Sequence, residues 1–383
     1  MTSESRRSDW SRSENAVLDR MWTALAEKRE AVLITVADVE GHAYRREGAK
    51  LVRDETGAAG SVTAGCLSSQ IRELVEAVRT SGEPQLVEFD LRDDDSWGLG
   101  LGCNGVIQLF AEPVDERFTR LRDAHLAGDD GVGLVVVDAG ASDEVAVGDR
   151  VYAPDGELSS GDGLPDWLVD FVSDRCRSLF ERDRSETVTV TDPAGSEIRV
   201  LLDTVTAPPE LSLFGSGTDI NPVAELAKQA GFRVKVVSFR GGRADPELFP
   251  HADRVLATSA TAVDESLTDD ADSYAIIMSH NAIDDRLCLA SLLETSVQYI
   301  GLMGPDERFE EIRDTLASEG NPLTGQDLER IYTPVGLDLG GGDPYQIAIS
   351  IVSELLAVEN DRNPGHLRDR GSPIHDRSTS DDA

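Results

Sequence analysis

One stretch, residues 211–240, constrains the fold more than any other part of the chain. An apolar run, Leu211 to Phe214, is short enough for a buried strand, and a glycine turn at 215–217 follows it. Asn221 and Pro222 then predict a helix start, with Asn at the cap and Pro at the first helical position. A second apolar run follows the helix. Together these features predict one unit of a parallel sheet, whose turn directs backbone N–H groups and a helix dipole at an anion.

The glycine turn departs from the dinucleotide-binding pattern G-x-G-x-x-G. Ile220 stands where the third glycine is expected. The second strand should end in Asp or Glu, which holds a ribose hydroxyl, but Ser238 stands there. We therefore interpret Gly215 and Gly217 as cofactor-binding candidates, while the sequence disfavours NAD(P).

After residue 240 the chain keeps alternating apolar strands with helices, which predicts an α/β fold with a doubly wound parallel sheet. Ligands of such sheets bind beyond the carboxyl ends of the strands. His280 follows a strand at 273–278, and Gly341 and Gly342 precede a helix that begins near Asp343. We expect these residues at the same edge as the first glycine turn. A packing or capping role for His280 is an equal alternative.

Two glycine-rich turns in the N-terminal half each carry a cysteine. Cys66 lies directly before a helix with an apolar stripe, and a helix N-terminus favours the thiolate. Simple packing of a small apolar side chain is the alternative. Gly102 and Cys103 lie in residues 98–105, where four of eight residues are glycine. Such a density of glycine indicates a backbone that closely approaches another group.

Composition excludes several classes of function. The chain has 36 basic and 72 acidic residues, a net charge of −36, which opposes binding to nucleic acid or anionic membranes. The acids are spread along the chain, so we interpret them as a hydrated, halophilic type of surface. The four cysteines show no C-x-x-C spacing, so the sequence predicts neither a disulfide framework nor a cysteine zinc site. Without a membrane-length apolar run or a signal peptide, a cytoplasmic location is expected.

At 383 residues the chain is long enough for two domains. The proline-containing segment 207–210 predicts a short, stiff linker between them. We therefore predict a disordered N-terminus over 1–13, an α+β domain over 14–206, a doubly wound domain over 211–360 and a polar tail over 361–383.

Six blocks of the sequence form a pattern when taken together: GSVTAGCLSSQ, GLGLGCNGVIQLFAEP, LFGSGTD, SHNAIDDRLCLASLL, YIGLMGPDERFEEI and PVGLDLGGGDPYQIAISIVSELLA. In this order they resemble the XdhC/CoxI family, the accessory proteins of xanthine dehydrogenase and related molybdenum hydroxylases. The chain departs from the family pattern at Ser68, where glutamate commonly follows G-C-L, and at Thr218, which replaces a histidine.

The resemblance implies an N-terminal cysteine-bearing domain, a C-terminal Rossmann-like domain and a non-catalytic maturation factor. Such a chaperone binds the molybdenum cofactor (molybdopterin) and inserts it into an apo-hydroxylase of the xanthine or carbon-monoxide dehydrogenase type. A cysteine desulfurase partner and a homodimer are also implied. The cofactor-binding residues expected on this basis are Cys66, Cys103, Gly102, Gly215, Gly217, His280, Gly341 and Gly342. Cys103 and Cys66 are the candidate contacts of the metal.

The alternative is an NAD(P)-dependent oxidoreductase, with residues 215–222 at the pyrophosphate and Cys66 or His280 as acid or base. Ser238 weighs against it, and so does the lack of a His–Asp motif among neighbouring residues. A third hypothesis is a structural assembly factor whose sheet crevice binds nothing.

Overall fold

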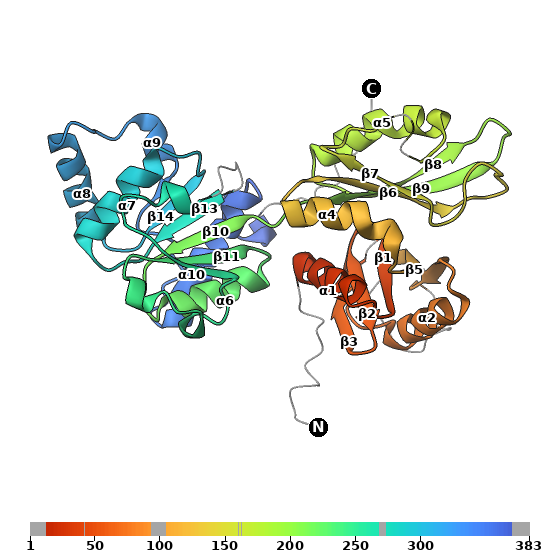
Figure 1. Cartoon of the computed structure of the whole chain (residues 1–383), viewed down its shortest axis with the longest axis horizontal. Helices are drawn as coiled ribbons and strands as arrows, with labels where there is room; N and C mark the ends of the chain where they lie inside the picture. Colours follow the sequence, from red (N-terminus) through yellow and green to blue (C-terminus); the bar gives the residue numbers. More distant parts are fainter. Residues whose placement is uncertain are drawn as a thin grey trace. The chain divides into compact units, whose positions relative to one another are not determined.

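The computed structural model describes residues 13–41, 43–92, 105–159, 161, 163–267 and 273–369. Its contacts divide the chain into two compact units, Met1–Pro208 and Pro209–Ala383. Figure 1 labels most of their helices and strands. Within the described ranges, no helix is both long and apolar enough to cross a lipid bilayer.

The N-terminal unit begins with an antiparallel five-stranded sheet in the order β3-β2-β1-β5-β4. Its elements are α1 (Glu14–Ala26), β1 (Ala31–Gly41), β2 (Lys50–Asp54), β3 (Gly57–Gly60), α2 (Ser68–Ser81), β4 (Gln85–Asp90) and β5 (Gly105–Pro113). Helix α2 covers one face through a stripe at helical spacing that includes Ile71 and Val78, packed on Val32 and Ile34 of β1. Because alternate strand residues face opposite sides, Leu33 packs under α1 instead.

A second antiparallel sheet, in the order β7-β6-β9-β8, completes this unit. Its elements are η2 (Glu116–Phe118), α4 (Thr119–Ala127), β6 (Gly131–Asp138), β7 (Arg150–Pro154), α5 (Asp166–Phe180), β8 (Glu186–Thr191) and β9 (Glu197–Val205). Helix α5 covers one face of the sheet. The other face packs on the first sheet through a small apolar cluster that includes Ala37, Phe110 and Val135. Helices α2 and α5 thus enclose two stacked sheets.

The two halves of this unit repeat one motif. Strands β2-β1-β5-β4 and β7-β6-β9-β8 have the same order, and β1 and β6 share a register break, between Val36 and Asp38 and between Val136 and Asp138. Gly48 and Gly148, one hundred positions apart, have φ of +84° and +91°. Their N–H groups donate to the carbonyls of Val36 and Val136 at 2.9 and 2.8 Å. The sequence did not reveal this duplication, because few residues are identical at positions one hundred apart.

The C-terminal unit is built on a six-stranded, fully parallel sheet in the order β12-β11-β10-β13-β14-β15. Its strands are β10 (Glu210–Phe214), β11 (Arg233–Ser238), β12 (Arg254–Ala257), β13 (Ser273–Ile277), β14 (Tyr299–Leu302) and β15 (Ile331–Tyr332). This is the strand order of a Rossmann fold, and the order reverses between β10 and β13. The predicted doubly wound sheet is therefore confirmed.

Helices cover both faces of this sheet (Figure 1). They are α6 (Ile220–Gln229), α7 (Ala282–Leu293), α8 (Asp306–Ser318), α9 (Gly325–Glu329) and α10 (Pro344–Glu359). Helices α6 and α10 share one apolar cluster with the strands, and α7 and α8 share the other. The predicted cap of α6 was wrong. The chain becomes helical one residue before Asn221, with Asp219 at the cap position, and the Asn221 amide instead donates to the Leu248 carbonyl at 3.0 Å.

Candidate functional site

The loops that follow β10 and β13 meet at the point where the strand order reverses. Gly215 continues β10 by donating its N–H to the Val237 carbonyl at 3.0 Å, and Met278 donates to the Phe214 carbonyl at 2.8 Å. A Cβ at position 215 would lie 2.5 Å from the Met278 carbonyl oxygen. Only glycine therefore allows the two loops to approach this closely.

A histidine–aspartate pair lies at this crevice. The Nε2 atom of His280, after β13, is 2.7 Å from Oδ2 of Asp219, at the start of α6. A Cβ added to Gly217 would lie 2.1 Å from Asp219 Oδ1 and 3.6 Å from His280 Cδ2, so this glycine makes room for the pair. His280 has φ of +56°, a conformation that is uncommon for residues other than glycine. Its side chain is 54% exposed and is therefore open to a ligand.

A buried carboxylate supports the loop that carries His280. The Ser279 hydroxyl donates to Asp285 Oδ1, and Arg308 donates to Asp285 Oδ2 at 3.1 Å. Burial raises the pKa of Asp285, although the Ser279 and Arg308 contacts oppose the shift. Asn281 caps α7 by accepting from two backbone N–H groups. The backbone is thus held on both sides of His280, at Ser279 and at Asn281.

The end of β11 offers no acidic group for a ribose. Ser238 is fully buried, and its hydroxyl donates to the Arg240 carbonyl at 2.9 Å. Arg240 in turn contacts Asp284 of α7. The position that holds a ribose carboxylate in dinucleotide-binding folds is therefore occupied by a short, internally bonded serine.

The second glycine turn of this unit is internally bonded. The N–H groups of Gly342 and Asp343 both donate to Gln346 Oε1, at 3.0 and 3.2 Å, in the capping box of α10. A Cβ at Gly341 would lie 2.5 Å from Gln346 Cβ. Gln346 therefore takes the Gly342 and Asp343 donors that an anion would need.

Cys66, in the N-terminal unit, is half-buried and lies between Gly65 and Leu67, the residue that caps α2. Its neighbours Gly65 and Ser68 line a pocket of about 400 Å³, whereas Cys66 itself packs against the apolar cluster between α2 and the sheet. The pocket is lined by Leu51, Arg53, Ser61, Val62, Thr63, Gly65, Ser68, Ile71 and Arg72. Arg72 is oriented by the Ser68 carbonyl, which accepts from its Nε at 3.1 Å. Two guanidinium groups and three hydroxyls make this pocket suitable for an anionic ligand.

The structure brings together three of the predicted residues, Gly215, Gly217 and His280, and places Cys66 in the other unit. Gly102 and Cys103 lie outside the described residues. Within the ranges that the structure covers, no cluster of three His, Cys, Asp or Glu residues could hold a metal ion.

Sequence reasoning missed the partners of the predicted residues. The sequence predicted no paired acid and base, and this was wrong: the structure pairs His280 with Asp219, 61 positions away, where no local motif could show it. Arg53 and Arg72 were missed because single arginines carry no pattern. The signals that could have revealed Asp219 are its place directly after the glycine turn and the strand-end place of His280.

The chain matches two family models and several known proteins. Residues 13–90 match the model described as the XdhC and CoxI family, and residues 211–355 match the XdhC Rossmann domain. A Bacillus subtilis protein, named as a probable xanthine dehydrogenase subunit, is 26% identical over 343 residues, which are 87% of this chain and 94% of that protein. The uncharacterized protein YqeB of Escherichia coli is 30% identical over 179 residues, 46% of this chain and 32% of that protein.

A solved structure is similar over nearly the whole length. It is a crystal structure described as a xanthine dehydrogenase from Bacillus halodurans, with a TM-score of 0.70 and 26% identity, covering 93% of this chain and 97% of that one. The two family models fall in order, one in each unit of the chain. The chain therefore belongs to the XdhC and CoxI family.

Proposed function

We propose that this chain is a maturation factor for a xanthine dehydrogenase-type molybdenum hydroxylase, and that it carries the molybdenum cofactor as cargo. The observation that carries this proposal is the pocket lined by Arg53, Arg72 and two neighbours of Cys66 in the chain, Gly65 and Ser68. Its volume, about 400 Å³, is within the range of small-molecule sites. Family membership and the names of two similar proteins support the choice of partner.

The residues around this pocket fit the chemistry of the cargo. Molybdopterin carries a phosphate, and guanidinium groups such as those of Arg53 and Arg72 bind phosphate through paired, charge-assisted hydrogen bonds. A thiolate is a soft ligand, which suits the metal of the cargo, and Cys66 is exposed enough to supply one. In this proposal Cys66 holds the metal end of the cargo, and the arginines hold its phosphate.

The test is the pterin content of protein purified from cells that make the cofactor. We expect Cys66→Ala and Arg72→Gln to lose most of the pterin. Cys176→Ala, at a fully buried thiol on α5, and Arg79→Gln, two turns further along α2, should retain it. Equal pterin content in Cys66→Ala and Cys176→Ala would contradict the role of Cys66. A cofactor-free protein in every case would remove the carrier proposal itself.

A second candidate function is an NAD(P)-dependent oxidoreductase. The Asp219–His280 pair at the crevice favours it, because a paired and exposed imidazole is a suitable acid or base for hydride-transfer chemistry. Ser238 opposes it, because no carboxylate is present there for the ribose. Titration with NADH, followed by its fluorescence, distinguishes the two: saturable binding that His280→Ala abolishes would favour the oxidoreductase.

A further inference from the structure

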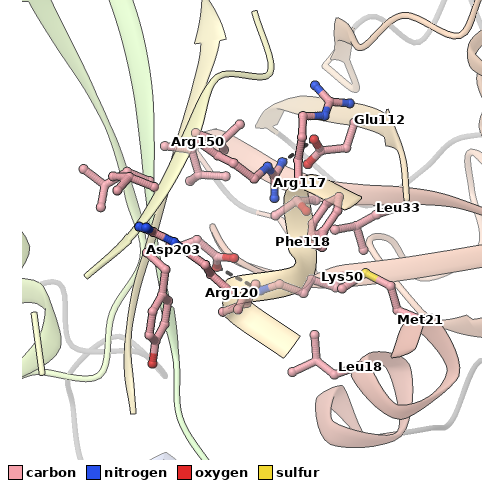
Figure 2. A pocket seen from close by; sticks show the side chains of 18 residues that line it. Leu18, Met21, Leu33, Lys50, Glu112, Arg117, Phe118, Arg120, Arg150 and Asp203 are labelled. Atoms are coloured by element: carbon pink, nitrogen blue, oxygen red, sulfur yellow. Dashed lines mark hydrogen bonds and ion pairs between the residues drawn. The ribbon is translucent and has the colours of Figure 1, made fainter. Parts of the chain in front are cut away.

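The duplicated N-terminal unit contains a cavity of about 140 Å³, separate from the pocket of about 400 Å³. Residues from both halves line it, several of them at equivalent positions one hundred residues apart. Leu33 and Gly133 are one such pair, and Lys50 and Arg150 are another. The cavity therefore lies where the two copies of the motif meet. Figure 2 shows the side chains around it.

Two reciprocal ion pairs join the halves across this cavity. Lys50 of the first half bonds Asp203 of the second, with Nζ and Oδ1 2.8 Å apart, and Arg150 of the second half bonds Glu112 of the first. The two acids are equivalent, because Leu33 pairs with Glu112 as Gly133 pairs with Asp203. Each half thus supplies one cation and one acid to the other. Figure 2 shows both pairs as dashed lines.

The lining has more cationic than acidic side chains. Arg117 and Arg120 line the cavity in addition to the two ion pairs, and both residues are exposed to solvent. Arg117 also holds Asp115, at 2.8 Å. The deeper Arg150 lies with its guanidinium carbon 3.7 Å from the centre of the Phe118 ring. Its Nε is buried and has no hydrogen-bond partner among the described groups. A donor directed at no acceptor indicates an anion or a water at this position.

The remaining walls are apolar, which favours an organic anion over a plain oxoanion. Met21, Leu33, Leu121 and Leu134 contribute them, and all four are buried. A cavity of about this volume in another protein holds a molecule of about six non-hydrogen atoms. We propose that the cavity binds a short-chain carboxylate, with its carboxylate group at Arg150 and Arg117 and its hydrocarbon part against the apolar walls.

Butyrate tests this proposal, with butyramide as the neutral molecule of the same size. Thermal unfolding of the full-length chain is followed by tryptophan fluorescence, because all four tryptophans lie within residues 1–208. At constant ionic strength we expect butyrate, but not butyramide, to raise the melting temperature in a saturable way. Isothermal titration calorimetry gives the dissociation constant of butyrate.

Two variants test whether butyrate binds in this cavity. A Cβ at position 133 would make only one ordinary contact, 3.7 Å from the Asp203 carbonyl oxygen, so the backbone there has room for a side chain. Gly133→Leu is chosen to fill the cavity that Gly133 lines. We expect it to raise the melting temperature of the free protein and to abolish the butyrate response. Arg117→Gln should weaken butyrate binding at least tenfold, and the distant, exposed Arg177→Gln should leave it unchanged.

Several results would overturn the proposal. Butyrate and butyramide could raise the melting temperature equally, or inorganic phosphate could raise it while butyrate has no effect. No probe could change the melting temperature, or butyrate could stabilise both Gly133→Leu and Arg117→Gln as fully as the unaltered protein. A full butyrate response in both variants would show that butyrate binds outside this cavity. A lack of response to every probe would show that the cavity holds only water.

Discussion

Replacement of Lys50 by methionine tests the junction between the two halves of the N-terminal unit. Lys50 is 4% exposed, and its Nζ donates to Asp203 Oδ1 at 2.8 Å and to the Gly48 carbonyl at 2.7 Å. Methionine retains most of the apolar length of the side chain and removes the charge. Asp203 would then keep one neutral donor, the Ser185 hydroxyl at 3.1 Å.

The expected loss is large because one charge stays buried. Removing one partner of a buried pair costs about 3–5 kcal/mol. Because the Ser185 hydroxyl still donates to Asp203, the cost of removing Lys50 should lie near the lower end of this range. The lost hydrogen bond to the Gly48 carbonyl adds about 1 kcal/mol. We expect Lys50→Met to lower the free energy of unfolding by about 4 kcal/mol. In Lys50→Met/Asp203→Leu no buried charge remains, so the double variant should lose only about 1–2 kcal/mol.

Urea unfolding followed by tryptophan fluorescence measures these free energies of unfolding for the N-terminal unit. The four tryptophans are Trp10, Trp22, Trp97 and Trp167, so the signal reports on residues 1–208 alone. For a slope of about 2 kcal/mol per molar urea, a loss of 4 kcal/mol moves the midpoint by about 2 M. The exposed pair Arg177–Glu157 supplies the control, and Arg177→Met should leave the curve unchanged.

Two results would refute this reasoning. A loss below about 1 kcal/mol in Lys50→Met would show that Lys50 is not held as a buried, paired charge. Additive losses from Lys50→Met and Asp203→Leu in the double variant would show that the two side chains do not interact, and the reciprocal arrangement of the halves would then be wrong.

Three further results are expected. Burial opposes ionisation of Asp54, but arginine and threonine hydrogen bonds hold its pKa well below the usual range. Ionised Asp54 therefore stabilises the protein fully above about pH 4, and this stabilisation is lost as the pH falls further. The difference in free energy of unfolding between the unaltered protein and Asp54→Asn should shrink as the pH of the unfolding experiment is lowered. In the native protein, iodoacetamide should label Cys66, but not Cys176, whose pKa burial raises to about 12; mass spectrometry of the peptides checks this. Gly217→Ala should displace Asp219 from its histidine, and unchanged imidazole NMR signals would contradict that expectation.

The sequence alone determined the local design of the C-terminal unit. Strand, glycine turn and helix follow one another within about thirty residues at 211–240, and each signal acts over a few positions. Alternation of strands and helices then requires a parallel sheet, because each crossover helix must pack on a face of it. Gly215, Gly217 and His280 could be placed at one edge for this reason.

The tertiary structure decided which side chains meet. Asp219 and His280 are 61 positions apart, and Lys50 and Asp203 are 153 apart. Such contacts depend on strand order, register and the stacking of two sheets, which no local periodicity encodes. The duplication was missed for a related reason. Few positions, such as Gly48 and Gly148, keep the same residue in both halves. Their equivalence becomes visible only when β1 and β6 are compared and found to break register at the same place.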